Sequence, residues 1–140
     1  MKTYQHTQPA TMILKGLGAV AAIYGLIAIR FHPLFIGTLA MAVVAWFFRS
    51  MTIEISDAEL TWYFGSGVPR KSIPLAEVVS AEAIRTNAWN GWGIHYTPRG
   101  WLYNVSGHDA VLITLRSGKR FCLGTDEPQE LVKELTKNNG

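Results

Sequence analysis

The first fifty residues contain no acidic residue and are dominated by two apolar runs. Residues 12–29 form a run of eighteen residues whose one charge is Lys15, and residues 33–48 form the second run after a short polar break. A helix of eighteen residues is about 27 Å long, close to the ~30 Å hydrocarbon core of a bilayer. Because both runs are apolar around their circumference, neither has the polar stripe of a surface helix. The pattern predicts a two-helix transmembrane hairpin in residues 1–50.

Two other structures fit part of this pattern. A signal peptide has a similar basic start, and Ala19-Val20-Ala21 matches the small residues of a cleavage site. That triplet, however, lies inside the apolar run, and a second run follows at once. Core helices of a soluble protein are also apolar, but they are usually shorter. Trp46 followed by Arg49 favours the membrane, because aromatic and basic side chains gather at its interface.

Charge is divided unevenly along the chain. Residues 1–50 hold four basic residues and no acidic one, whereas residues 51–140 hold nine Lys or Arg and ten Asp or Glu. Nucleic-acid-binding domains cluster Lys and Arg on a folded surface, so the near-neutral second part disfavours nucleic acid as a partner. Three of the four basic residues of the hairpin lie on the side of its two ends. The positive-inside rule therefore predicts that residues 51–140 are cytoplasmic.

Small residues recur in both apolar runs, with spacings such as Gly18 to Ala22. Small side chains let membrane helices approach closely, so the hairpin offers a surface for association with other copies of the chain. General enrichment of Gly and Ala in membrane helices explains the same residues. A homo-oligomer formed through the transmembrane helices is thus one expected partner arrangement, beside the membrane lipids themselves.

Residues 51–140 are predicted to form six or seven antiparallel strands followed by one helix. Alternating apolar residues and turn clusters place strands at 51–56, 60–64, 70–75, 78–84, 111–115 and 119–123. In the last of these, Phe121 and Leu123 are expected to point inward and Cys122 outward. Asp126 is a suitable cap for a final helix whose buried face is Leu131, Val132 and Leu135. A small barrel or sandwich closed by this helix buries that face.

The order of these motifs resembles a known family. Two apolar spans lead directly into Ile53-Glu54-Ile55-Ser56, and a hairpin ending at Gly65 is followed by Arg70-Lys71-Ser72-Ile73-Pro74-Leu75 and by Val78-Val79. This pattern resembles the pleckstrin-homology-like (PH-like) domains of small bacterial membrane proteins, over roughly residues 1–135. The resemblance implies an antiparallel, partly open barrel of about seven strands with a C-terminal helix, tethered to the bacterial inner membrane. It supplies no catalytic residue.

The segment 85–105, RTNAWNGWGIHYTPRGWLYNV, departs from the family pattern. It holds three of the five tryptophans and several glycines, and a loop of this length in a compact domain is often functional. Tryptophan, tyrosine and arginine are typical of membrane interfaces and of protein-binding hot spots. The candidate binding residues are therefore Arg85, Trp89, Trp92, Arg99, Trp101 and Tyr103.

Three interpretations of this segment remain open. Its indole rings can fold back onto the barrel, they can contact lipid headgroups beside Arg85 and Arg99, or they can bind a protein partner. Exposed rings would favour the second and third interpretations, because an exposed apolar patch indicates an interaction surface.

Motifs for catalysis are sparse. The single cysteine, Cys122, excludes an intramolecular disulfide and has no general base next to it in the sequence that would activate it as a nucleophile. His95, His108 and Asp109 lack the spacing of a metal site. We therefore expect no catalytic residue, no metal and no cofactor. The sequence predicts a non-enzymatic, membrane-anchored PH-like binding or scaffold module that presents its Trp/Gly-rich loop near the bilayer. The alternative is a module that senses lipid headgroups through that loop and the adjacent arginines.

Overall fold

The N-terminal part of the chain forms an apolar helical hairpin. The computed structural model describes residues 2–30, 33–87 and 93–138, and all but the side chain of Leu34 within them. Helix α1 spans Thr11–Ala28 and helix α2 spans Leu34–Phe47, close to the predicted spans. Most of their large apolar side chains are exposed, with Leu26 at 73% and Ile36 at 75%. Within the described residues, α1 alone is long and apolar enough to cross a membrane, while α2 is shorter.

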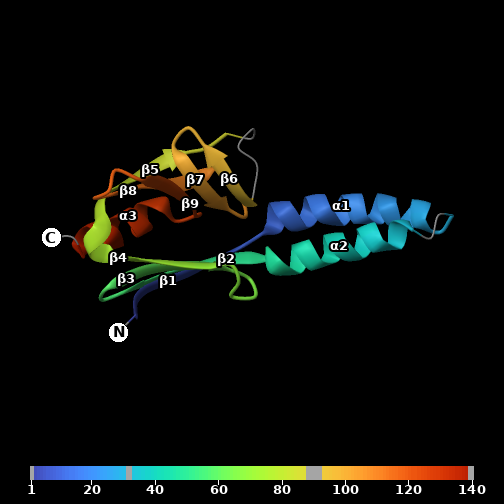
Figure 1. Cartoon of the computed structure of the whole chain (residues 1–140), viewed down its shortest axis with the longest axis horizontal. Helices are drawn as coiled ribbons and strands as arrows, with labels where there is room; N and C mark the ends of the chain where they lie inside the picture. Colours follow the sequence, from blue (N-terminus) through green and yellow to red (C-terminus); the bar gives the residue numbers. More distant parts are fainter. Residues whose placement is uncertain (1, 31–32, 88–92, 139–140) are drawn as a thin grey trace.

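A strand that the sequence analysis missed precedes the hairpin. Strand β1 (Lys2–Pro9) pairs antiparallel with β2 (Ser50–Ser56), which follows α2. The pairing runs from Lys2 opposite Ser56 to Pro9 opposite Ser50, and the Ala10 N–H then donates to the Arg49 carbonyl at 2.8 Å. Both helices therefore leave the sheet from adjacent strands, without a linker. Figure 1 shows the hairpin projecting from one end of the strands, with both chain ends at the other end.

The first sheet has four antiparallel strands in the order β1-β2-β3-β4. Strand β3 spans Glu59–Phe64 and β4 spans Arg70–Pro74. Its inner face is apolar, while its outer face is polar, because side chains alternate along a strand. The carboxylate of Glu54 on the outer face accepts hydrogen bonds from Lys2 Nζ at 2.9 Å and Tyr63 Oη at 2.8 Å. Burial opposes ionisation of Glu54, but these bonds and the charges of Lys2 and Arg70 prevail and lower its pKa.

The second sheet has five strands in the order β5-β8-β9-β7-β6. The short helix η1 (Leu75–Glu77) leads into it, and its strands are β5 (Val78–Arg85), β6 (Gly93–Thr97), β7 (Gly100–Asn104), β8 (Asp109–Leu115) and β9 (Arg120–Gly124). The expectation of about seven strands was too low, because β1, β6 and β7 were not predicted. The expectation of a wholly antiparallel structure was also wrong, since β7 pairs parallel with β9. The described part is an α+β structure with two open sheets.

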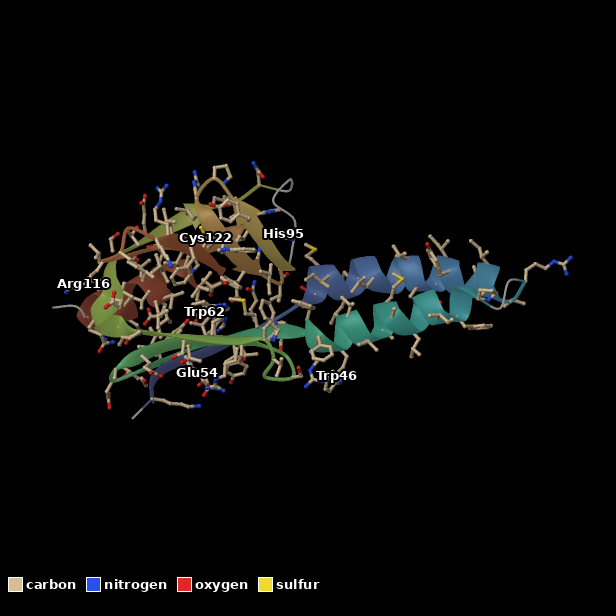
Figure 2. All side chains as sticks on the ribbon, viewed as in Figure 1. Trp46, Glu54, Trp62, His95, Arg116 and Cys122 are labelled. Atoms are coloured by element: carbon tan, nitrogen blue, oxygen red, sulfur yellow. The ribbon has the colours of Figure 1, made fainter. Side chains whose placement is uncertain are left out.

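The main core lies between the two sheets and helix α3 (Pro128–Lys137). Leu131 and Leu135 of α3 are fully buried, as the helical spacing predicted. Figure 2 shows Trp62 between the sheets, where its ring stacks on Phe121 at 4.9 Å between ring centroids. Cys122 is buried on the opposite face of the second sheet, in a small cluster with Leu102 and Ala110, which confirms its predicted outward direction.

Substitution of Gly100 tests how closely the β6–β7 turn approaches β9. Its φ is +104°, and a Cβ there would overlap the carbonyl oxygen of Arg120. Gly118 also has positive φ, at +82°, but a Cβ there would meet no atom within 4 Å. We expect Gly118→Ala to lower the free energy of unfolding by about 1–2 kcal/mol through backbone strain alone. Gly100→Ala should cost roughly 1–3 kcal/mol more, because the turn must also move away from β9.

The measurement is guanidinium unfolding of the detergent-solubilised protein, followed by tryptophan fluorescence. Equal destabilisation by the two substitutions would show that the turn does not pack against β9 as described.

Candidate functional site

The structure divides the predicted binding residues between two faces of the second sheet. Arg85 and Arg99 line a hollow on the outer face, whereas Trp101 and Tyr103 lie along a slot between the two sheets. The segment expected to be a long loop is therefore largely a β-hairpin, in which the alternation of side chains separates neighbouring residues. Trp89 and Trp92 lie outside the described residues.

The outer hollow has a volume of about 370 Å³ and combines a basic rim with an apolar floor. Arg85 and Arg99 belong to its rim, and the floor includes Ile84, Leu102 and Cys122. Asp109 lies opposite Arg85 in the strand register, but the two form no ion pair within 4 Å. Neither arginine side chain has an acidic partner or a hydrogen bond among the described residues. Two unpaired guanidinium groups around one hollow provide donors for an anion.

Local hydrogen bonds fix the backbone beside both arginines. Thr97 Oγ1 accepts from the Arg99 N–H at 3.2 Å and donates to the Gly100 carbonyl at 2.8 Å, which closes the β6–β7 turn. On the other side of the hollow, the N–H of Thr86 donates to the His108 carbonyl at 2.6 Å. The two sides of the rim, at Arg85 and at Arg99, therefore come from separate segments, and each segment is held by its own hydrogen bonds.

The slot between the sheets is smaller and mostly apolar. Its volume is about 300 Å³, and its lining consists of Trp62, Phe64, Pro69, Lys71, Ile94, Trp101 and Tyr103. Trp101 is 49% exposed and packs edge-on against Tyr96, with ring centroids 5.5 Å apart, whereas Tyr103 is buried, and its burial raises the pKa of its phenol. Trp101 and Tyr103, the candidate aromatic residues that the structure describes in this segment, therefore differ: Trp101 is half exposed, and Tyr103 belongs to the core.

Sequence reasoning did not identify Trp62 and Lys71 as site residues. Trp62 was expected in the core, and Lys71 was assigned only to a basic pair with Arg70. In the structure Lys71 lies opposite Trp62 in the strand register, on the same face as Ile73, while Arg70 lies on the other face beside Glu54. The signal in the sequence was the spacing of Lys71 and Ile73: the two residues are two positions apart and therefore share the inward face of the predicted strand.

A third hollow lies where the hairpin meets the second sheet. It has a volume of about 420 Å³ and is lined by Met12, Ile13, Gly16, Leu17, Val44, Phe48 and Gly93. Every one of these residues is apolar or glycine. The start of β6 is therefore placed beside the base of the two helices, at the end of the molecule from which they project (Figure 1).

No cluster of three metal-ligating side chains occurs among residues 2–30, 33–87 and 93–138. His95 lies on β6 and His108 in the turn before β8. Comparison with known proteins yields no family model, no curated protein and no solved structure that matches this chain. The site must therefore be interpreted from its own geometry.

Cys122 reports on the charge of the outer hollow. Burial raises the pKa of its thiol, and the positive charges of Arg99 and Arg120 act in the opposite direction. Replacing Arg99 with Gln removes one of these charges, so the pKa should rise further. We expect the pH at which alkylation by N-ethylmaleimide reaches half its maximal rate to move upward, because the thiolate is the reactive form.

The midpoint of the pH profile, not the plateau rate, is the relevant measurement, since the plateau also reflects access. Lys133→Gln on α3 is a matched control that should leave the midpoint unchanged. A midpoint unaltered by Arg99→Gln would show that this side chain does not lie near the thiol.

Proposed function

We propose that this protein is a non-enzymatic binding module anchored in the bacterial inner membrane by the α1–α2 hairpin, with its two sheets on the cytoplasmic side. One observation carries the proposal: an apolar hairpin with exposed side chains leaves the sheet directly from the paired strands β1 and β2. In water, this much contiguous exposed apolar surface is strongly unfavourable. Burial of the hairpin in lipid removes this unfavourable exposure along the whole length of both helices.

The position of β1 favours an anchor over a cleaved signal sequence. Strand β1 precedes α1 and supplies the edge of the first sheet, where His6 lies opposite Ile53. Cleavage after α1 would remove β1 and leave the edge of β2 without its partner, exposing unpaired backbone groups. An anchor keeps both strands of the pair in the mature protein.

The residues at the base of α2 support the same location. Trp46 is 53% exposed, and the Arg49 guanidinium lies 5.1 Å from the centroid of its ring. Such an aromatic ring with a basic side chain is typical of a membrane–water interface. Figure 2 shows Trp46 at the end of the hairpin that adjoins the sheets. The bilayer surface would then lie where the helices meet β2.

We further infer that the sheets and α3 form a PH-like domain, as the sequence resemblance implies. The four-stranded sheet, the second sheet and the C-terminal helix follow the expected order, and the basic pair and the Ile-Pro-Leu segment fall at β4 and η1. The additional β1 and the parallel β7–β9 pair depart from that expectation. A scaffold that holds a protein partner near the bilayer is the function this arrangement supports best.

A second candidate function rests on the outer hollow. Arg85 and Arg99 have no acidic partner among the described residues, and a phosphate of a lipid headgroup would satisfy both. In that case the module senses headgroups. Association between copies is a separate proposal, supported by Gly16, Gly18 and Gly25 of α1, at which an added Cβ would meet no atom of the chain within 4 Å.

Quenching of tryptophan fluorescence by brominated phospholipids tests the anchoring. We expect lipids brominated near the headgroup to quench the vesicle-reconstituted protein more than lipids brominated near the chain ends, because Trp46 lies at the interface. Trp46→Phe should remove the largest share of this shallow quenching. Trp62 serves as the internal reference, because its side chain is buried between the sheets and should not be quenched.

Trp92→Ala distinguishes the two functions. A comparable loss of shallow quenching in this variant would favour headgroup contact by the loop, whereas an unchanged signal would favour a protein partner. If no bromine position quenched the wild-type protein, the hairpin would not be in the bilayer and the proposal would be wrong.

A further inference from the structure

The indole N–H of Trp62 is a buried donor that lacks an acceptor. Trp62 is 3% exposed, and its Nε1 has no hydrogen-bond partner among the described residues. A buried polar group without a partner is unfavourable, and native proteins rarely retain one without a reason. Trp62 lines the slot of about 300 Å³, so a molecule in that slot is placed to supply the acceptor.

Lys71 adds a positive charge to the same slot. It lies opposite Trp62 in the register of β3 and β4, so their Cβ atoms are about 4.5–5.5 Å apart. The Lys71 side chain forms no ion pair among the described residues, and the residues that line the slot include no acid. One indole N–H and one ammonium group match the two oxygens of a single carboxylate.

The apolar part of the slot continues towards the hairpin. Phe64 of the slot packs edge-on against Phe48 of the hollow at the hairpin base, with ring centroids 4.9 Å apart. Ile94 of the slot directly follows Gly93 of that hollow. The linings of the two hollows thus adjoin, one hollow lying beside the helices and the other lined by Trp62. This shape suits a single flexible chain better than a compact aromatic molecule.

From these observations we infer that the slot binds a medium-chain fatty acid, with its carboxylate at Trp62 and Lys71 and its tail directed towards the base of the hairpin. A volume near the lower end of the usual range for ligand pockets fits one chain and not a two-chain phospholipid. The source of the acid, the surrounding membrane, rests on the proposed anchoring. The binding chemistry itself rests on the slot alone.

The test follows the indole N–H signal of Trp62 by NMR in ¹⁵N-labelled protein incorporated into nanodiscs. The signal is assigned by elimination, replacing each of the other four tryptophans with Phe in turn, which leaves Trp62 in place. Titration with decanoate should shift this signal downfield as the carboxylate accepts the hydrogen bond. Octanoate, which is two methylenes shorter, should require roughly fifteen-fold more ligand, because each methylene contributes about four-fold to affinity.

Lys71→Gln is the diagnostic variant, since Lys71 is exposed at the mouth of the slot and its replacement leaves the core intact. It should raise the decanoate concentration at half-shift roughly ten-fold, through loss of the charged contact. Lys119→Gln, an exposed lysine outside the slot, should leave that concentration unchanged. Methyl decanoate, which carries no charge, should bind the wild-type protein and Lys71→Gln equally and weakly.

Three results would overturn the inference: a Trp62 signal that decanoate leaves in place, equal shifts of all five indole signals, or equal decanoate affinity in wild type and Lys71→Gln. Elution of the protein with the discs is a separate readout that reports on anchoring. Protein that elutes with the discs but shows no Trp62 shift contradicts the fatty-acid site alone. Protein that fails to enter the discs contradicts the anchoring, and the titration is then made in aqueous buffer.

Discussion

The antiparallel pairing of β1 with β2 is the constraint on which the rest of the structure depends. Strand β1 precedes the helical hairpin in the sequence and β2 follows it, so the chain enters α1 and leaves α2 at adjacent positions of one sheet. The β7–β8 turn holds the same place, because Gln8 Nε2 donates to the Ser106 carbonyl at 3.0 Å and the Thr11 and Ser106 hydroxyls lie 3.2 Å apart. The hairpin is thus held by the first sheet and by this turn, and its direction is set by the direction of the strands.

This attachment decides which surfaces lie near the base of the helices. Strand β3 runs towards the hairpin, where Phe64 meets Phe48, and β6 starts beside Met12 and Ile13. The slot between the sheets therefore adjoins the base of the hairpin, while the hollow with Arg85 and Arg99 lies on the outer face of the second sheet. The slot is mostly apolar and has one basic side chain, Lys71, whereas the outer hollow has two, Arg85 and Arg99. The two sites therefore suit different ligands.

Local patterns predicted some parts of this structure and long-range pairing determined the others. The apolar runs, strands β2–β5, β8 and β9, and the buried face of α3 were predictable, because hydropathy and periodicity are properties of single segments. Strand β1 is polar along most of its length and becomes a strand through pairing with β2, which the hairpin separates from it in sequence. The parallel contact of β7 with β9 likewise depends on β8 lying between β5 and β9. The candidate residues were found by composition, but their division between two faces required knowledge that residues 93–104 form a hairpin.

A disulfide trap between Thr7 and Thr52 tests most directly that the strand pair encloses a membrane hairpin. Their hydroxyl oxygens lie 2.8 Å apart across β1 and β2, so cysteines at these positions, with Cys122→Ser to remove the native thiol, are suitably placed to cross-link. Oxidation of isolated membranes should join the two cysteines in nearly all of the full-length protein, while Thr7→Cys combined with Ser117→Cys should remain unlinked. Absence of the Thr7–Thr52 cross-link, or a membrane-free protein from which β1 and α1 have been cleaved, would contradict this structure of the anchor.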